Sequence, residues 1–177
     1  MEPQLADPRP RERRSKGQAL VEFALVSMLL VLLLGGVVEF GFLFDHKLEL
    51  ANAARGGARW GASHSTAWSA AATPPSNTIE GQVQAAGGTT ALTNDDSHVL
   101  VEYLAVSGSS LVPCGHYSVS SGAFVAQGGY TQATCVTPGN LVRVTLTNSY
   151  PLVTGLLGGV VGASVTVQAL ASMPVMA

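Results

Sequence analysis

The chain has 177 residues, of which 47% are apolar and only 11% are charged. Soluble domains usually carry about a quarter charged residues, so this composition excludes a uniformly hydrophilic protein and indicates that part of the chain avoids water. The apolar surplus is concentrated between Ala19 and Phe44. The remainder is rich in Ala, Gly, Ser and Thr and is long enough for one small domain of about a hundred residues.

The net charge of −2 conceals an uneven distribution of charges. Residues 1–17 hold five of the nine bases and three of the eleven acids, which leaves four bases and eight acids for the remainder. Because basic residues next to a membrane helix stay on the cytoplasmic side, this order predicts a cytoplasmic N-terminus and an extracytoplasmic C-terminal part. An acidic exported part without a basic stripe argues against nucleic-acid binding.

The first predicted elements are a leader and a long helix. Residues 1–16 have no apolar periodicity and are predicted to be unstructured, within a basic cytoplasmic leader that covers residues 1–17. As a helix, Ala19–Phe44 would cover roughly 39 Å, against about 30 Å for the hydrocarbon core of a membrane. Glu39 is expected near the outer membrane interface, where water would solvate it. An amphipathic stripe then continues the helix to about Trp60; its members are Phe40, Phe44, Leu48 and Ala51.

A linker and a short helix are expected next. Residues 61–77 contain the helix-breaking pair Pro74-Pro75 among Ser, Thr and Ala, so a domain boundary is predicted there. Asn77 and Glu80 have the spacing of a capping box. The short helix predicted behind them ends at Gly87-Gly88; its apolar face consists of Ile79, Val83 and Ala86.

Alternating apolar and polar residues predict three strands in the C-terminal part, over residues 99–106, 141–147 and 164–172. These strands are expected to form one antiparallel sheet. The predicted fold class is therefore α+β. A transmembrane and stalk helix over residues 18–60 is followed by a small antiparallel sheet domain with one short helix over residues 78–177.

Cys114 and Cys135 both lie in the predicted exported part. An even cysteine count in an oxidising compartment favours a disulfide over a metal site, and two buried free thiols are the alternative. The Gly/Ser-rich segment 107–139 around them is predicted to be a stapled loop with one hairpin, in which residues 118–125 pair with residues 131–136. Leu152–Val161 is too short to span a membrane and is predicted to be a buried connector.

The segment most informative about function joins the basic leader to the apolar run and reads Lys16-Gly17-Gln18-Ala19-Leu20-Val21-Glu22-Phe23. A small residue at position 17 allows a protease to approach the backbone closely. Glu22 lies in an otherwise apolar helix, where a carboxylate costs about 2.5 kcal/mol or somewhat more on insertion unless it finds a partner. An isolated membrane carboxylate of this kind calls for a functional explanation.

This segment resembles the prepilin processing site, in which a glycine is followed by four residues and a glutamate. More closely, it resembles the TadE-like family of the tight-adherence (Flp) pilus system. The resemblance extends through the leucine run to Ala54-Arg55-Gly56-Gly57-Ala58-Arg59, which matches the family's alanine-arginine-x-glycine-alanine-arginine ending. It implies a processing site made of Gly17, Gln18, Glu22 and Phe23, with cleavage after Gly17.

Cleavage there would place a positive amine on Gln18, and Glu22 could pair with this amine in its own or a neighbouring subunit. The resemblance implies that Glu22 helps to place the subunit in the assembly. Alternatively, Glu22 lies at headgroup level and is solvated by snorkelling. Arg55 and Arg59 share a helix face, where they could contact lipid phosphates or acidic groups of a partner; a plain solvated face is the alternative.

The function implied by the resemblance is that of a minor pseudopilin of a tight-adherence pilus or related secretion system. Its expected partners are a prepilin peptidase, other pilus subunits, inner-membrane assembly proteins and membrane lipid. The alternative is an uncleaved, membrane-anchored envelope scaffold or adhesin-like binding module. No enzymatic activity, cofactor or metal site is expected, because the four histidines are scattered without metal-ligand spacing and no catalytic motif occurs. The expected location is the cytoplasmic membrane, with a single pass and subsequent incorporation into a surface pilus.

Overall fold

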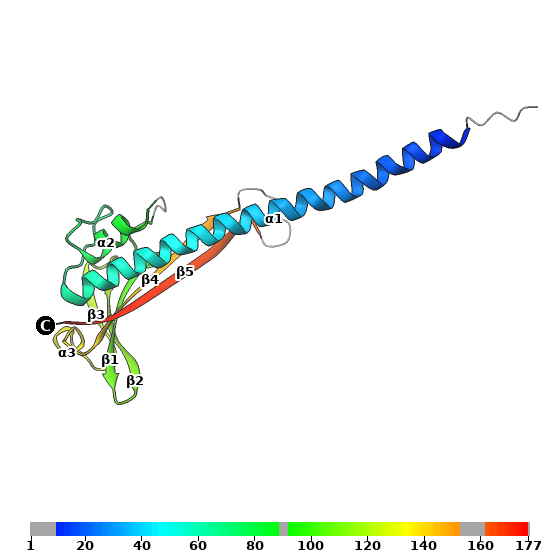
Figure 1. Ribbon diagram of the computed structural model, residues 1–177. Helices are drawn as coiled ribbons and strands as arrows, with labels where there is room; N and C mark the ends of the chain where they lie inside the picture. Colours follow the sequence, from blue (N-terminus) through cyan, green and yellow to red (C-terminus); the bar gives the residue numbers. More distant parts are fainter. Residues whose placement is uncertain (1–9, 89–91, 153–161, 177) are drawn as a thin grey trace, which may run out of the picture.

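The computed structural model describes residues 10–88, 92–152 and 162–176. A long helix projects from a small domain built on a five-stranded antiparallel sheet, which confirms the predicted α+β fold (Figure 1). The elements in chain order are α1 (Pro10–Ser63), α2 (Ile79–Ala86), β1 (Val99–Ser107), β2 (Ser110–Ser118), β3 (Ala123–Ala126), α3 (Gln132–Cys135), β4 (Leu141–Pro151) and β5 (Ser164–Pro174).

Helix α1 begins earlier than the sequence pattern predicts. It starts at Pro10, so residues 10–16 are helical and the prediction of an unstructured segment up to residue 16 is wrong for them. Proline is well suited to the first turn of a helix, and the Arg- and Glu-rich stretch behind it has good helix propensity. At the other end α1 stops at Ser63, three residues beyond the predicted Trp60, where the Ser63 hydroxyl donates to the Trp60 carbonyl at 3.2 Å.

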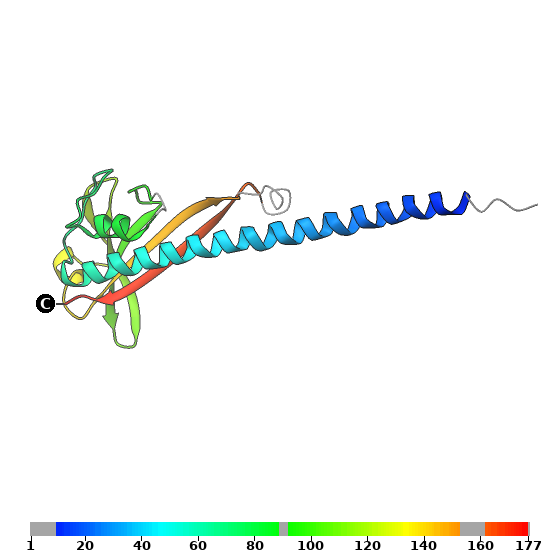
Figure 2. The ribbon, with the colours of Figure 1, turned by 45° about the horizontal axis from the view of Figure 1, so that its top comes forward.

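The sheet has the strand order β3-β2-β1-β4-β5 with every neighbouring pair antiparallel. The second half of α1 and the short helix α2 cover one face of this sheet, and strands β4 and β5 run along α1 towards its projecting part (Figure 2). The three strands predicted from alternation are confirmed, and each extends beyond its predicted end. Their inward side chains are buried and form the core with α1 and α2; they include Val101, Tyr103, Val142, Val144 and Leu146.

The segment between the cysteines is more regular than predicted, and the predicted hairpin is wrong. Strand β2 pairs with both β1 and β3, whereas residues 132–135 form helix α3. The chain turns directly from β1 into β2 because Ser107 pairs with Ser110, and Gly108 adopts a positive φ of 63° between them. Helix α3 is fixed by a capping box, in which Thr131 accepts from the Thr134 backbone and the Thr134 side chain accepts from Thr131.

Helix α2 is confirmed, but the predicted cap is wrong. The N-cap residue is Thr78, whose hydroxyl accepts from the Gly81 backbone N–H at 3.1 Å, and not Asn77. Glu80 is fully buried and accepts from the Ser69 backbone instead of completing a capping box. The connector predicted over Leu152–Val161 lies, from residue 153 onward, outside the described residues.

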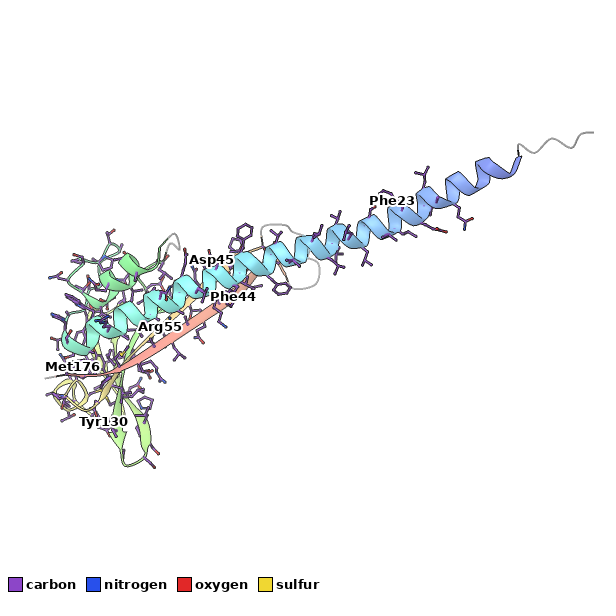
Figure 3. All side chains as sticks on the ribbon, viewed as in Figure 1. Phe23, Phe44, Asp45, Arg55, Tyr130 and Met176 are labelled. Atoms are coloured by element: carbon purple, nitrogen blue, oxygen red, sulfur yellow. A yellow bond between two sulfur atoms is a disulfide. The ribbon has the colours of Figure 1, made fainter. Side chains whose placement is uncertain are left out.

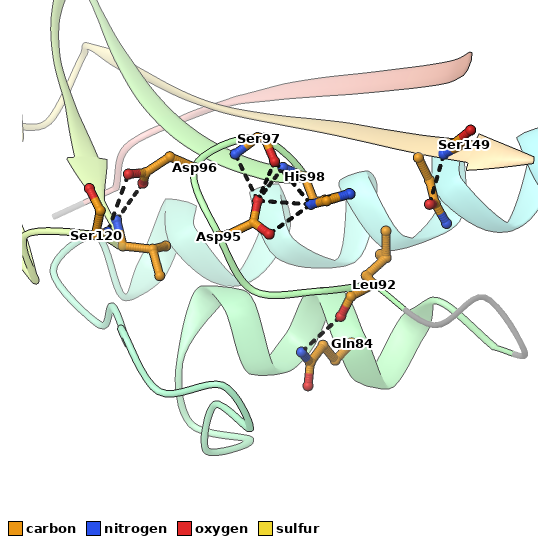
Figure 4. Close-up of polar contacts among 10 residues, drawn as sticks. Gln84, Leu92, Asp95, Asp96, Ser97, His98, Ser120 and Ser149 are labelled. Carbon is orange, nitrogen blue, oxygen red and sulfur yellow. Dashed lines mark hydrogen bonds and ion pairs between the residues drawn. The ribbon is translucent and has the colours of Figure 1, made fainter. Parts of the chain in front are cut away.

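A tight turn aligns the start of β1 (Figure 4). Asp95 accepts from the backbone N–H groups of Ser97 and His98 at 2.8 and 2.9 Å. The Ser97 hydroxyl, followed by the other donors of this turn, lowers the pKa of Asp95 to about 2. Asp96 faces the other way and accepts from the Val119 and Ser120 backbones, which joins the end of β2 to the start of β1.

Candidate functional site

The predicted processing residues lie on the exposed projecting part of α1. Gly17, Gln18, Glu22 and Phe23 are all exposed, and a Cβ added at Gly17 would meet no atom within 4 Å. The Gln18 side-chain amide donates to a Glu22 carboxylate oxygen at 3.2 Å, so these two residues share one helix face. Phe23 points away from the helix with 70% of its surface exposed (Figure 3).

Beyond these residues the apolar part of α1 has no covering element within the described structure. No side chain from Gln18 to Val38 is buried, and this stretch of 21 residues is about 31 Å long as a helix. That length matches the hydrocarbon core of a membrane, which is about 30 Å thick. By length and composition, α1 is therefore able to cross a membrane, and its bare part has the right extent to do so.

Glu39 marks the point where α1 enters the domain. It was expected to be solvated at the membrane interface, but only 1% of its surface is exposed, so that expectation is wrong. Its negative charge adds to the effect of desolvation in raising the pKa of Tyr150 at the end of β4. The His46 ring lies 5.3 Å from the Tyr150 ring. Periodicity placed Glu39 on the helix correctly but could not show that the end of β4 reaches it.

The second half of α1 packs closely against α2 and the sheet because its inward positions are small. Ala54 and Ala58 are fully buried. A Cβ added at Gly57 would overlap the Val83 Cγ2 methyl group, and one at Gly61 would lie 2.9 Å from Ile79 Cδ1. The small residues of the alanine-arginine-rich segment thus allow the backbone of α1 to approach its neighbours.

A comparison with protein families identifies this helix. The model of the family described as TadE-like protein matches residues 17–59. Over this segment the chain is similar to the TadE-like family. The match covers the bare apolar arm and the close-packed half of α1, and it supports a protein associated with the tight-adherence pilus. No curated protein and no solved structure matches the chain.

Arg55 and Arg59 are the outward members of the TadE-like segment's last turns. Both are exposed, and the Arg55 guanidinium donates to the Asn52 side chain at 3.1 Å (Figure 3). Arg59 lines a shallow pocket together with residues that include Trp60, His64 and Gln82. Both arginines therefore lie on one accessible side of the helix.

The predicted disulfide between Cys114 and Cys135 is present. Both residues are fully buried, and their Cα atoms are 5.5 Å apart. The bond joins β2 to α3, far from the TadE-like segment's exposed arm. In the part of the chain that the structure describes, no three His, Cys, Asp or Glu side chains gather in a way that could hold a metal ion.

Glu80, which the sequence pattern assigned only to a capping box, is a buried carboxyl group. Glu80 is fully buried, and burial raises its pKa to about 7, although the hydrogen bond from Ser69 opposes the increase. The segment predicted as a linker folds over it, because the Trp68 indole donates to Tyr103 at 3.0 Å and stacks on Tyr117. The only sequence signal was Trp68 itself, a large aromatic residue in an otherwise small and polar segment.

Proposed function

We propose that the chain is a minor pseudopilin of a tight-adherence (Flp-type) pilus or related secretion system, cut after Gly17 and assembled through its N-terminal helix. One observation carries this proposal. The TadE-like segment begins with a bare apolar arm on which Gln18 and Glu22 lie on one face and in hydrogen-bond contact. The exposed apolar side chains of this arm must be kept from water, by a membrane before assembly and by neighbouring helices after assembly.

Cleavage after Gly17 would convert the first turn of this arm into a docking group. The new α-amine of Gln18 would be largely positive at neutral pH, since such amines have pKa values of about 7.7–8.0. Glu22 is already within reach of the Gln18 side chain, so it is placed to pair with this amine or with that of a neighbour. Pairing would remove much of the cost of a carboxylate in apolar surroundings, which is about 2.5–3.5 kcal/mol.

Helix α1 is continuous through the proposed cleavage bond, so the peptidase must open the helix locally. Gly17 is suited to this because glycine costs a helix about 1 kcal/mol relative to alanine, and its surroundings are empty. The basic residues before it would hold the N-terminus on the cytoplasmic side. The domain would then lie in the extracytoplasmic space, where the disulfide is expected to persist.

The proposed partners follow from this location. They are a prepilin peptidase, other pilus subunits, inner-membrane assembly proteins and the surrounding lipid.

A second candidate function, an uncleaved anchored scaffold or adhesin-like module, is favoured by the β1–β2 hairpin. This hairpin projects from the domain and exposes the cross-strand pair Val106 and Leu111 (Figure 1).

Two substitutions at the start of the arm test the proposed function. Gly17→Arg should leave a larger membrane-bound precursor on a gel when expressed with the peptidase, whereas Gly17→Ala, which keeps the residue small, should be processed. Glu22→Ala should insert normally, since it removes a membrane charge, but should be poorly incorporated into pili. Normal maturation of Gly17→Arg would refute the assigned cleavage site, and wild-type incorporation of Glu22→Ala would refute the pairing role.

A further inference from the structure

A groove lies between α1 and the outer strand β5 where the domain meets the bare arm. Its walls are formed by Leu43 and Lys47 of α1 and by residues 165–168 of β5, and its volume is about 220 Å³. Leu43, Val165 and Val167 are apolar, Lys47 provides the one charge of the lining, and Thr166 and Gln168 alternate with the two valines along β5. The groove is too small for a whole lipid but large enough for a phosphate and the glycerol unit attached to it.

The position of this groove along α1 places it at a membrane surface. If the bare arm ends at Val38, Leu43 lies about 7 Å and Lys47 about 13 Å above the hydrocarbon core. The headgroup layer on each side of a bilayer is about 5–7 Å thick. Side chains on a helix tilt towards its N-terminus, which here is the membrane side. The Lys47 side chain tilts the same way, so its ammonium group can reach towards the phosphates of the headgroup layer.

Lys47 is available for a ligand. Among the described residues it makes no ion pair or hydrogen bond. Asp45 and Glu49 are each two residues away, so they point to other sides of the helix and do not share its face. The groove thus combines an unpaired cation with apolar walls that continue the surface of the bare arm.

We propose that this groove binds the headgroup of an anionic phospholipid in the extracytoplasmic leaflet. The phosphate would contact Lys47, and the glycerol part of the headgroup would lie against Leu43 and Val165. The proposal rests on the membrane-spanning role given above to the bare arm. Bound lipid would fix the height and rotation of the domain on the membrane while the subunit awaits assembly.

The test uses the full chain in nanodiscs made of equal parts phosphatidylglycerol and phosphatidylethanolamine. Native mass spectrometry measures the ratio of the two lipids that stay bound to the released protein. The wild type should retain mainly phosphatidylglycerol, and Lys47→Gln should lower this enrichment about five-fold, the value of one lysine near an anionic surface. Lys47→Arg should retain it, and Val165→Phe, which fills the groove without changing the charge, should lose it.

Arg59→Gln provides the matched comparison, because it removes the same charge from the far end of α1. A general attraction between the domain and the anionic surface would make Arg59→Gln as effective as Lys47→Gln, and that result would overturn the proposal. Equal retention of both lipids by the wild type would overturn it too. A photoreactive phosphatidylglycerol should cross-link within residues 43–47 or 165–168, and cross-links elsewhere would count against the groove. Failure of the chain to enter nanodiscs at all would instead refute the membrane-spanning arm.

Discussion

The substitution Gly57→Ala tests whether the TadE-like segment is held by close helix packing. The added Cβ would overlap the Val83 Cγ2 methyl group and lie 3.5 Å from both the Ile79 carbonyl oxygen and Val144 Cγ1. Val83 is fully buried, and a β-branched side chain in a helix has one strongly preferred rotamer, so it cannot swing away. Overpacking of this kind costs about 1–3 kcal/mol, and alanine regains up to about 1 kcal/mol of helix propensity. We expect a net loss of up to about 2 kcal/mol.

The assay is urea unfolding of the full chain in detergent micelles, followed by the fluorescence of Trp60 and Trp68. Gly41→Ala is the matched control, because it lies in the same helix and its Cβ would meet no atom within 4 Å. This control should be as stable as the wild type or slightly more stable. In a Val83→Ala background the same Gly57→Ala change should cost less, since the overlapping methyl group is gone. Equal stability of Gly57→Ala and Gly41→Ala would refute the packing argument.

Three further changes test other parts of the fold in the same unfolding assay. Gly81→Ala should lose about 3 kcal/mol or more, because its Cβ would overlap the Pro75 carbonyl oxygen, which is backbone and cannot turn aside; a loss below that of Gly57→Ala would contradict this. The folded-state pKa of Glu80 is about 7 against an ordinary 4.5, so the folded state binds the proton more tightly and stability should fall by about 3 kcal/mol as the pH rises through this window. Glu80→Gln should remove that fall. If the variant lost as much stability as the wild type between about pH 5 and about pH 8, Glu80 would not be the source of the fall. Replacing Cys114 and Cys135 together by alanine should cost about 3 kcal/mol for a bond that spans 21 residues, and reduction of the wild type should have a similar effect; an unchanged urea midpoint would rule out a stabilising bond.

The sequence predicted those parts of the fold in which one periodicity governs a whole element. Strand β4 alternates Val142, Val144 and Leu146 with polar residues, and this alternation follows from one face being buried against α1. Strand β2 gave no such signal. Its pairing with β1 shifts register between Tyr103 and Leu104, and it contains Pro113, so its pattern does not repeat every second residue.

The candidate site also has a part that could be predicted from the sequence and a part that could not. The exposure of Gly17 and Glu22 follows from an apolar helix with no covering element, which composition alone can indicate. The burial of Glu39 and Glu80 could not be predicted, because it depends on where distant segments come to lie. From the sequence alone a glutamate is expected to be exposed, because glutamates are rarely buried in proteins. Only the packing of distant segments around these two glutamates buries them.

The most direct test of the proposed function is the N-terminal sequence of the protein isolated from membranes or pili of its native host. We predict that the mature chain begins at Gln18, with residues 1–17 removed. A protein that still carries the Arg-rich leader would contradict it, because Glu22 would then have no new amine to pair with and α1 would serve only as an anchor.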